Sequence, residues 1–265
     1  MNCEDYKSSL DKVYNKFWNC NGECKYYNEC KKRLRNKTPK FRQDRVRVGK
    51  DYGEPNVPKI LCVGIEGFID ECNLDENKIL TKYLMPSSNA QNAHYNGVKY
   101  TLAYILSPFF DKEKPIPLVG NNICSNYDWT TSKYCLLNLY KCAFVPIDNP
   151  TKLRDLPHTI GMKKHCQELL LEEFEVLDPD VIILQTVQYP EGLWANIKEK
   201  FKLDLEFGKN DNTSVFKGTL NGRQVLFVST YHGASSVFQS KDYIKTYLNP
   251  VLDKTIDLLR EYNIN

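Results

Sequence analysis

The sequence predicts an α/β fold, a three-layer α/β/α arrangement in which helices cover both faces of a central four-stranded, mostly parallel sheet. Short apolar runs, rich in leucine or β-branched residues, alternate with helical patterns along the chain. A run that is apolar at nearly every position is typical of a strand buried on both faces, as the strands of parallel sheets are. The four runs are residues 59–65, 134–140, 181–186 and 224–229.

The predicted helices lie before, between and after these strands. The strongest, residues 158–177, ends at Asp178-Pro179, because proline does not continue a helix. The other predicted helices are residues 5–19, 92–107, 190–201 and 241–262. A length of 265 residues, 42% of them hydrophobic, is enough for one buried core. We therefore expect a single domain over residues 1–265, with a cysteine-rich and basic segment, about 18–50, packed on it.

The charge of the chain is unevenly distributed. The formal net charge is +3, but residues 31–50, called here the basic segment, hold ten Lys or Arg and one Asp. The basic segment therefore carries +9 and the other 245 residues carry −6. Ten cations within twenty residues can neutralise several phosphates. Because the basic segment directly follows a cysteine-rich segment, we expect contact with DNA rather than a merely solvated loop. The arginines expected to contact phosphates are Arg33, Arg35, Arg42, Arg45 and Arg47.

Two classes of protein are not expected from this sequence. The chain has no run of about eighteen apolar residues, which a membrane-spanning helix requires. Its first residues, MNCEDYKSSLDK, lack the apolar centre of a signal peptide. We therefore expect a cytoplasmic protein that has no membrane partner and is a monomer.

The ten cysteines fall into distinct sequence contexts. Cys62 and Cys135 lie inside apolar runs and are expected in the core. Three others crowd into a polar segment, and two follow much later in the chain. In a reducing compartment, such cysteines are more often metal or cluster ligands than disulfides. Four thiolates suit zinc or an iron–sulfur cluster, and the spacing does not choose between them. The five candidate ligands, of which four are expected to bind, are Cys20, Cys24, Cys30, Cys142 and Cys166.

Three different polar groups lie at or near the carboxyl ends of the predicted strands. Glu66 follows the first strand, Asn138 lies near the end of the second, and His232 follows the last. Each has a structural explanation, as a solvated turn carboxylate, a satisfied core amide or a turn histidine. Ligands of open α/β sheets bind beyond the carboxyl ends of the strands. The three groups together therefore favour one catalytic or binding cleft.

The order of these motifs resembles the uracil-DNA glycosylase superfamily and, within it, the iron–sulfur branch known as family 4. The resemblance covers about residues 20–240. Its motifs are Cys24 and its neighbours, the basic segment, Val63-Gly64-Ile65-Glu66-Gly67, Asn138-Leu139-Tyr140-Lys141-Cys142, Cys166, Asp178-Pro179-Asp180-Val181-Ile182 and His232. Gly67 and Gly233 stand where the family has prolines, and three amino-terminal cysteines stand where it has two.

The resemblance implies a monofunctional DNA glycosylase that hydrolyses the N-glycosidic bond of a flipped-out uracil or modified pyrimidine. The product is an abasic site, made in base-excision repair or in defence against phage with modified DNA. No lysine stands out as a Schiff-base nucleophile, which fits hydrolysis without strand cleavage. Gly67 and Gly233 remove side-chain bulk near the expected pocket, which favours a bulky or hypermodified base. The alternative is a non-catalytic iron–sulfur DNA-binding module on a degenerate glycosylase scaffold.

The resemblance also implies a role for each candidate residue. Glu66 would orient water or stabilise the positively charged sugar, and His232 would donate a hydrogen bond to a carbonyl oxygen of the departing base. Asn138 would read the Watson–Crick edge. Phe68 is the first candidate to stack on the base, because it follows Glu66 by two residues, and Tyr95 and Tyr100 are weaker candidates. The cofactor implied is a structural 4Fe–4S cluster, with zinc as the second choice.

Overall fold

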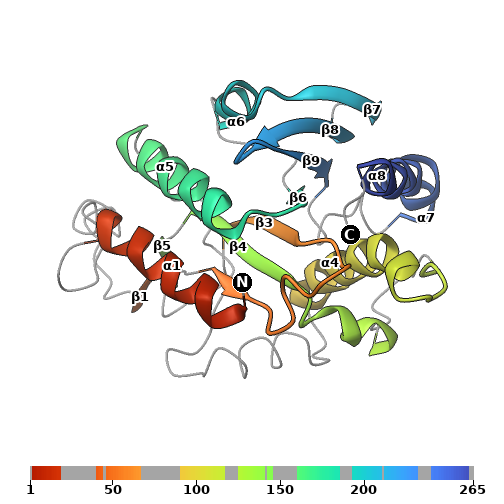
Figure 1. Ribbon diagram of the computed structural model, residues 1–265, viewed down its shortest axis with the longest axis horizontal. Helices are drawn as coiled ribbons and strands as arrows, with labels where there is room; N and C mark the ends of the chain where they lie inside the picture. Colours follow the sequence, from red (N-terminus) through yellow and green to blue (C-terminus); the bar gives the residue numbers. More distant parts are fainter. Residues whose placement is uncertain are drawn as a thin grey trace.

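The computed structural model of the chain contains a large sheet with helices packed on it (Figure 1). The structure describes residues 2–18, 40–43, 46–66, 90–116, 125–140, 142–145, 160–185, 193–210, 212–231 and 240–262. Within these residues, seven strands form the large sheet and two more form a separate small one. None of the described helices combines the length and the apolar composition that a bilayer span requires.

The centre of the large sheet is made of four parallel strands. Their order is β4-β3-β6-β9, and each neighbouring pair is parallel. Their bounds are β3 Ile60–Glu66, β4 Tyr134–Tyr140, β6 Val181–Gln185 and β9 Arg223–Thr230. These are the four predicted strands, with ends that differ by one residue at most from the predicted ones. The apolar runs identified them because each is buried on both faces.

Three further strands extend this centre, so the prediction of a four-stranded sheet is wrong in its strand number. They are β2 Arg47–Val48, β7 Asp204–Asn210 and β8 Thr213–Leu220. β2 pairs antiparallel with β4 at one edge, and β8 and β7 follow β9 at the other, also antiparallel. β2 has only two residues, and β7 is half exposed with Leu205 62% exposed, so neither carries an apolar run.

Helices pack on both faces of the sheet and make two separate cores. One face is covered by α1 Cys3–Phe17, α5 Ile160–Leu177 and α6 Leu193–Phe201, whose buried side chains meet Leu61, Val63, Ile182 and Leu184. The opposite face is covered by α4 Ala90–Leu106 and α8 Asn249–Glu261, which meet Ile60, Cys62, Val181 and Ile183. Figure 1 shows α1 beside α5 on one side of the sheet and α4 near α8 on the other. Successive residues of a strand point to opposite faces of the sheet, so these two sets of residues show which face each strand position occupies.

The last predicted helix, residues 241–262, is interrupted. It begins as α7 Lys241–Tyr243, widens to a π-helical turn over Ile244–Leu248 and continues as α8. The widening follows from Pro250, which has no N–H to donate and whose ring would clash with a carbonyl one turn earlier. The other described connections include the 3₁₀ turns Ser107–Phe109 and Ser125–Thr130.

Candidate functional site

The carboxyl edge of the parallel strands brings two of the candidate positions together. The structure describes the backbone of Glu66 and Asn138 and leaves their side chains outside the described residues. The Cα of Asn138 is in register with Gly64, and that of Glu66 with Tyr140. Glu66 and Asn138 therefore lie two residues apart along neighbouring strands. Both have the strand parity of Ile60 and Cys62, which places their positions on the α4/α8 face of the sheet.

The end of β9, which leads toward His232, is held by aromatic contacts. The ring of Tyr231 lies edge-on to Tyr243, with centroids 5.2 Å apart, and its hydroxyl accepts a hydrogen bond from Asn212 at 3.1 Å. The hydroxyls of Tyr243 and Thr213 are 2.8 Å apart. His232 and Phe68 both lie outside the described residues. The described part of the site therefore ends at Tyr231, one residue before His232, and these contacts hold the end of β9 in place.

Two predictions about aromatic and cysteine side chains have clear outcomes. Tyr100, one of the weaker stacking candidates, is only 3% exposed, and its hydroxyl donates to Asn249 Oδ1 at 2.8 Å. It is a core residue on α4, and the stacking role is wrong for it. Cys62 and Cys135 are fully buried, as predicted. Burial raises the pKa of both thiols, which keeps them protonated and unsuited to metal binding without a rearrangement.

Gln185 also lies at the carboxyl edge of the parallel strands and was not among the residues predicted from the sequence. It is the last residue of β6 and is 0% exposed. Within the described residues, neither its Oε1 nor its Nε2 has a hydrogen-bond partner. An orphaned buried polar group costs about 1–3 kcal/mol, so such groups are rare in folded proteins and each calls for an explanation. The sequence signal for Gln185 was its position at the end of the apolar run VIILQ, because a polar amide does not contribute to apolar packing there.

The candidate cluster ligands are only partly described. Cys166 lies on α5, is 8% exposed and belongs to the core shared with α1. Its neighbour His165 packs against Phe17 at the end of α1, with ring centroids 5.2 Å apart. The described end of α1 therefore packs beside the helix that carries Cys166.

Of the remaining candidate ligands, the structure describes the backbone of Cys142. Cys142 opens β5 Cys142–Val145, whereas Cys20, Cys24 and Cys30 lie outside the described residues. Among the described side chains, no three His, Cys, Asp or Glu residues are arranged to hold a metal ion. Because most of the proposed thiols lie outside the described side chains, the cluster stays a prediction.

The basic segment pairs directly with the strand that carries Cys142. Its strand β1 Lys40–Gln43 is antiparallel to β5, with Arg42 in register with Ala143 and Gln43 with Cys142. Arg47, by contrast, lies in β2 with only 9% of its surface exposed, so we correct its assignment as a phosphate contact. Pairing of β2 with β4 buries it, which local charge did not reveal. Arg33, Arg35 and Arg45 lie outside the described residues, as does the side chain of Arg42.

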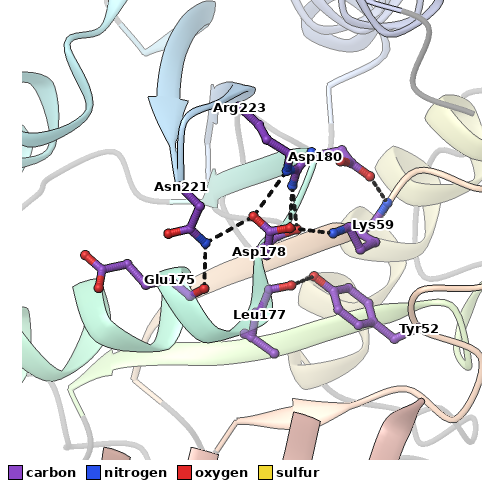
Figure 2. Close-up of polar contacts among 8 residues, drawn as sticks. All are labelled: Tyr52, Lys59, Glu175, Leu177, Asp178, Asp180, Asn221 and Arg223. Carbon is purple, nitrogen blue, oxygen red and sulfur yellow. Dashed lines mark hydrogen bonds and ion pairs between the residues drawn. The ribbon is translucent and has the colours of Figure 1, made fainter. Parts of the chain in front are cut away.

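The Asp178-Pro179-Asp180 motif lies at the amino edge of the sheet, opposite the candidate site. Figure 2 shows Arg223 between the two carboxylates. Its guanidinium is 2.8 Å from Asp178 Oδ2 and 2.9 Å from Asp180 Oδ1. Lys59 joins the same group through its Nζ, 2.9 Å from Asp178, and through its backbone N–H, which donates to Asp180 at 2.7 Å. This cluster ties together the starts of β3, β6 and β9, so its role is structural.

The cluster makes folding stability sensitive to acid through Asp178. Burial alone would raise the pKa of this carboxyl, but hydrogen bonds and charges from Arg223 and Lys59 outweigh it and lower the pKa. A carboxyl whose pKa is lower in the folded state stabilises the fold fully at pH values above its unfolded pKa of about 3.9. This stabilisation is lost as pH falls through the folded-state pKa. We expect Asp178→Asn to be less stable than the wild type at pH 7, and the gap to shrink below about pH 4.

Thermal unfolding between pH 7 and pH 2 measures this difference. Asp204→Asn, an exposed change at the start of β7, is the matched control and should follow the wild-type curve. A gap between wild type and Asp178→Asn that stays constant down to pH 2 would contradict the ion-pair explanation.

No protein-family model matches the chain, and no curated protein is significantly similar to it.

Proposed function

We propose that the chain is a monofunctional DNA glycosylase that hydrolyses the N-glycosidic bond of an extruded uracil or modified pyrimidine and leaves an abasic site. The observation that carries the proposal is the placement of Glu66 and Asn138 on one face of neighbouring parallel strands, at the edge where such sheets bind ligands. β9 is separated from β3 by β6 and ends at the same edge of the sheet with Thr230, two residues before His232. In this proposal the four parallel strands and their helices form a three-layer α/β/α body, and β2, β7 and β8 are additions to it.

The proposed chemistry divides the charge that develops as the bond breaks. The sugar becomes positive and the departing base becomes negative. Glu66 orients water or stabilises the sugar, and His232 donates a hydrogen bond to a carbonyl oxygen of the base. Asn138 has both a donor and an acceptor on one amide, so it can read the Watson–Crick edge of an extruded pyrimidine. Phe68 stacks on the base in this proposal.

The proposed DNA surface lies next to the proposed cluster. The pairing of Gln43 with Cys142 supports this arrangement, because it joins the basic segment to a candidate ligand. Four of Cys20, Cys24, Cys30, Cys142 and Cys166 hold a structural 4Fe–4S cluster that orders the segment, with zinc as the second choice. An all-thiol donor set fits either occupant. Iron and acid-labile sulfide in aerobically purified protein, with absorbance near about 400 nm, would support the cluster, and zinc alone would contradict it.

Removing charge from the basic segment should weaken DNA binding in a salt-dependent way. Each substitution that removes a phosphate contact should lower the slope of log affinity against log salt concentration by about 0.9. The substitutions to test are Arg33→Gln, Arg35→Gln, Arg42→Gln and Arg45→Gln. Base preference should not change, because phosphate contacts carry no sequence information. Fluorescence anisotropy over a salt series measures the slope.

The matched control for this series is Arg260→Gln, which removes an exposed cation at the end of α8. Its slope should equal the wild-type slope. Equal slopes for the control and for all four basic-segment variants would contradict the proposed DNA surface.

A panel of duplexes tests the proposed activity. Each duplex carries one uracil, hypoxanthine or modified cytosine, and heating in alkali converts abasic sites to strand breaks. Breaks on at least one pyrimidine duplex support the proposal. Tight DNA binding without breaks on any duplex would instead favour the non-catalytic DNA-binding module.

A further inference from the structure

Gln185 occupies a position in the sheet that suits ligand binding better than structural support. Its Cα is in register with Thr230 on β9, and the preceding residue, Leu184, is in register with Val63 on β3. The next position on β3 is Gly64, which is itself in register with Asn138 on β4. One row across the four parallel strands therefore reads Asn138, Gly64, Gln185, Thr230. Two amide-bearing positions flank a residue that has no side chain.

The row neighbours of Gln185 do not supply its amide with a partner among the described residues. Gly64 offers no side chain, and the Thr230 hydroxyl donates to the Tyr231 carbonyl at 3.1 Å. Gln185 has the strand parity of Val181 and Ile183, which lie in the core with α4 and α8. Glu66 has the same parity, so Gln185 shares a sheet face with the proposed catalytic carboxylate.

The topology places Gln185 at the point where such sheets open to ligands. From β3 the chain proceeds to β4 on one side, and then crosses to β6 and β9 on the other. The strand order therefore reverses between β3 and β6, and ligands of open α/β sheets bind in the crevice beyond the strand ends at such a point. Gln185 ends the second of these two strands.

We propose that Gln185 is a specificity-determining residue whose amide hydrogen-bonds a polar substituent of the extruded base, outside its Watson–Crick edge. This inference rests on the proposed function. There, Asn138 takes the Watson–Crick edge and His232 takes a carbonyl oxygen. These contacts account for the polar groups of plain uracil, and a base with an additional polar group offers a partner to a further buried amide. The substrate class is therefore a pyrimidine with a hydroxyl- or amino-bearing substituent.

A near-isosteric pair of substrates isolates this hydrogen bond. 5-Hydroxymethyluracil differs from thymine by one hydroxyl on the 5-substituent. A site built to hydrogen-bond a substrate hydroxyl rejects the analogue that lacks it, because the protein group is then left unpaired. We expect the wild type to excise 5-hydroxymethyluracil at least about tenfold faster than thymine from otherwise identical duplexes.

The experiment compares wild type, Gln185→Met and Gln224→Met by single-turnover excision and by thermal unfolding. Methionine keeps the size of glutamine and removes its hydrogen bonds. Gln224 is an exposed glutamine at the start of β9, at the opposite edge of the sheet, and serves as the control. Gln185→Met should lose the preference for 5-hydroxymethyluracil while its Tm stays equal or rises, because an orphaned amide is replaced by an apolar group. Gln224→Met should keep the wild-type preference.

Two results would overturn the inference and leave the proposed function standing. One is excision with an unchanged preference in Gln185→Met. The other is a Tm of Gln185→Met several degrees below wild type, which would mean that hydrogen bonds within the folded protein already hold the amide. Failure of the wild type to excise any base would be a different result, and would remove the proposed function together with this inference.

Discussion

Glu66→Gln is expected to lower single-turnover base release by about 10²–10⁴-fold while DNA affinity stays unchanged. Glutamine keeps the size of glutamate but cannot take a proton from water or stabilise a positive sugar with a full negative charge. Glu66 ends β3 on the face shared with Asn138, so the substitution acts at the carboxyl edge and not in the sheet core. Rapid-quench kinetics and anisotropy on the same duplex separate rate from affinity.

The control for Glu66→Gln is Glu261→Gln, which makes the same change at an exposed position at the end of α8. Its rate should equal the wild-type rate. If Glu66→Gln also releases base at the wild-type rate, Glu66 has no part in the chemistry.

Asp180→Ala is expected to lower the free energy of unfolding by about 2–3 kcal/mol. The Asp180 side chain is 5% exposed and accepts hydrogen bonds from Arg223 and from the backbone N–H of Lys59. Its removal leaves the partly buried N–H of Lys59 without its acceptor and loosens the tie between β3 and β6. The loss should stay below that of a fully buried pair, because Arg223 is 40% exposed and retains Asp178. Denaturant unfolding measures it.

Asp204→Ala is the matched control for Asp180→Ala, because Asp204 is exposed at the start of β7. Its effect should lie within about 0.5 kcal/mol of zero. Equal stabilities of the two variants would show that the amino-edge cluster does not tie the strands together.

The parallel centre of the fold could be predicted because its strands carry their signal locally. Residues 181–185 are apolar at four positions and buried at all five, so composition and burial agree. The β8–β9 hairpin also carries a local signal in the sequence. Its turn is Asn221-Gly222, with φ of 50° and 76°, and this pair is the strongest short hairpin signal. β7 gave no such signal, because an exposed edge strand needs no apolar run.

The candidate site was harder to predict because its features depend on strand pairing. Glu66 and Asn138 could be predicted at one edge, since carboxyl ends of parallel strands meet there. Arg47 looked like a surface cation within the basic segment, yet pairing of β2 with β4 buries it. Gln185 looked like part of an apolar strand, and only the register with Thr230 and the neighbouring Gly64 reveals an amide with no partner among the described residues.

The central claim, N-glycosidic hydrolysis, is tested most directly by the released base itself. Mass spectrometry identifies the free base from single-turnover reactions with protein in excess over a duplex that holds one modified pyrimidine, and abasic sites are counted in the same DNA. The proposed function predicts equal amounts of free base and abasic site from at least one duplex, and neither product from Glu66→Gln within the time of one wild-type turnover. DNA that is fully bound and yields no free base from any duplex would contradict it.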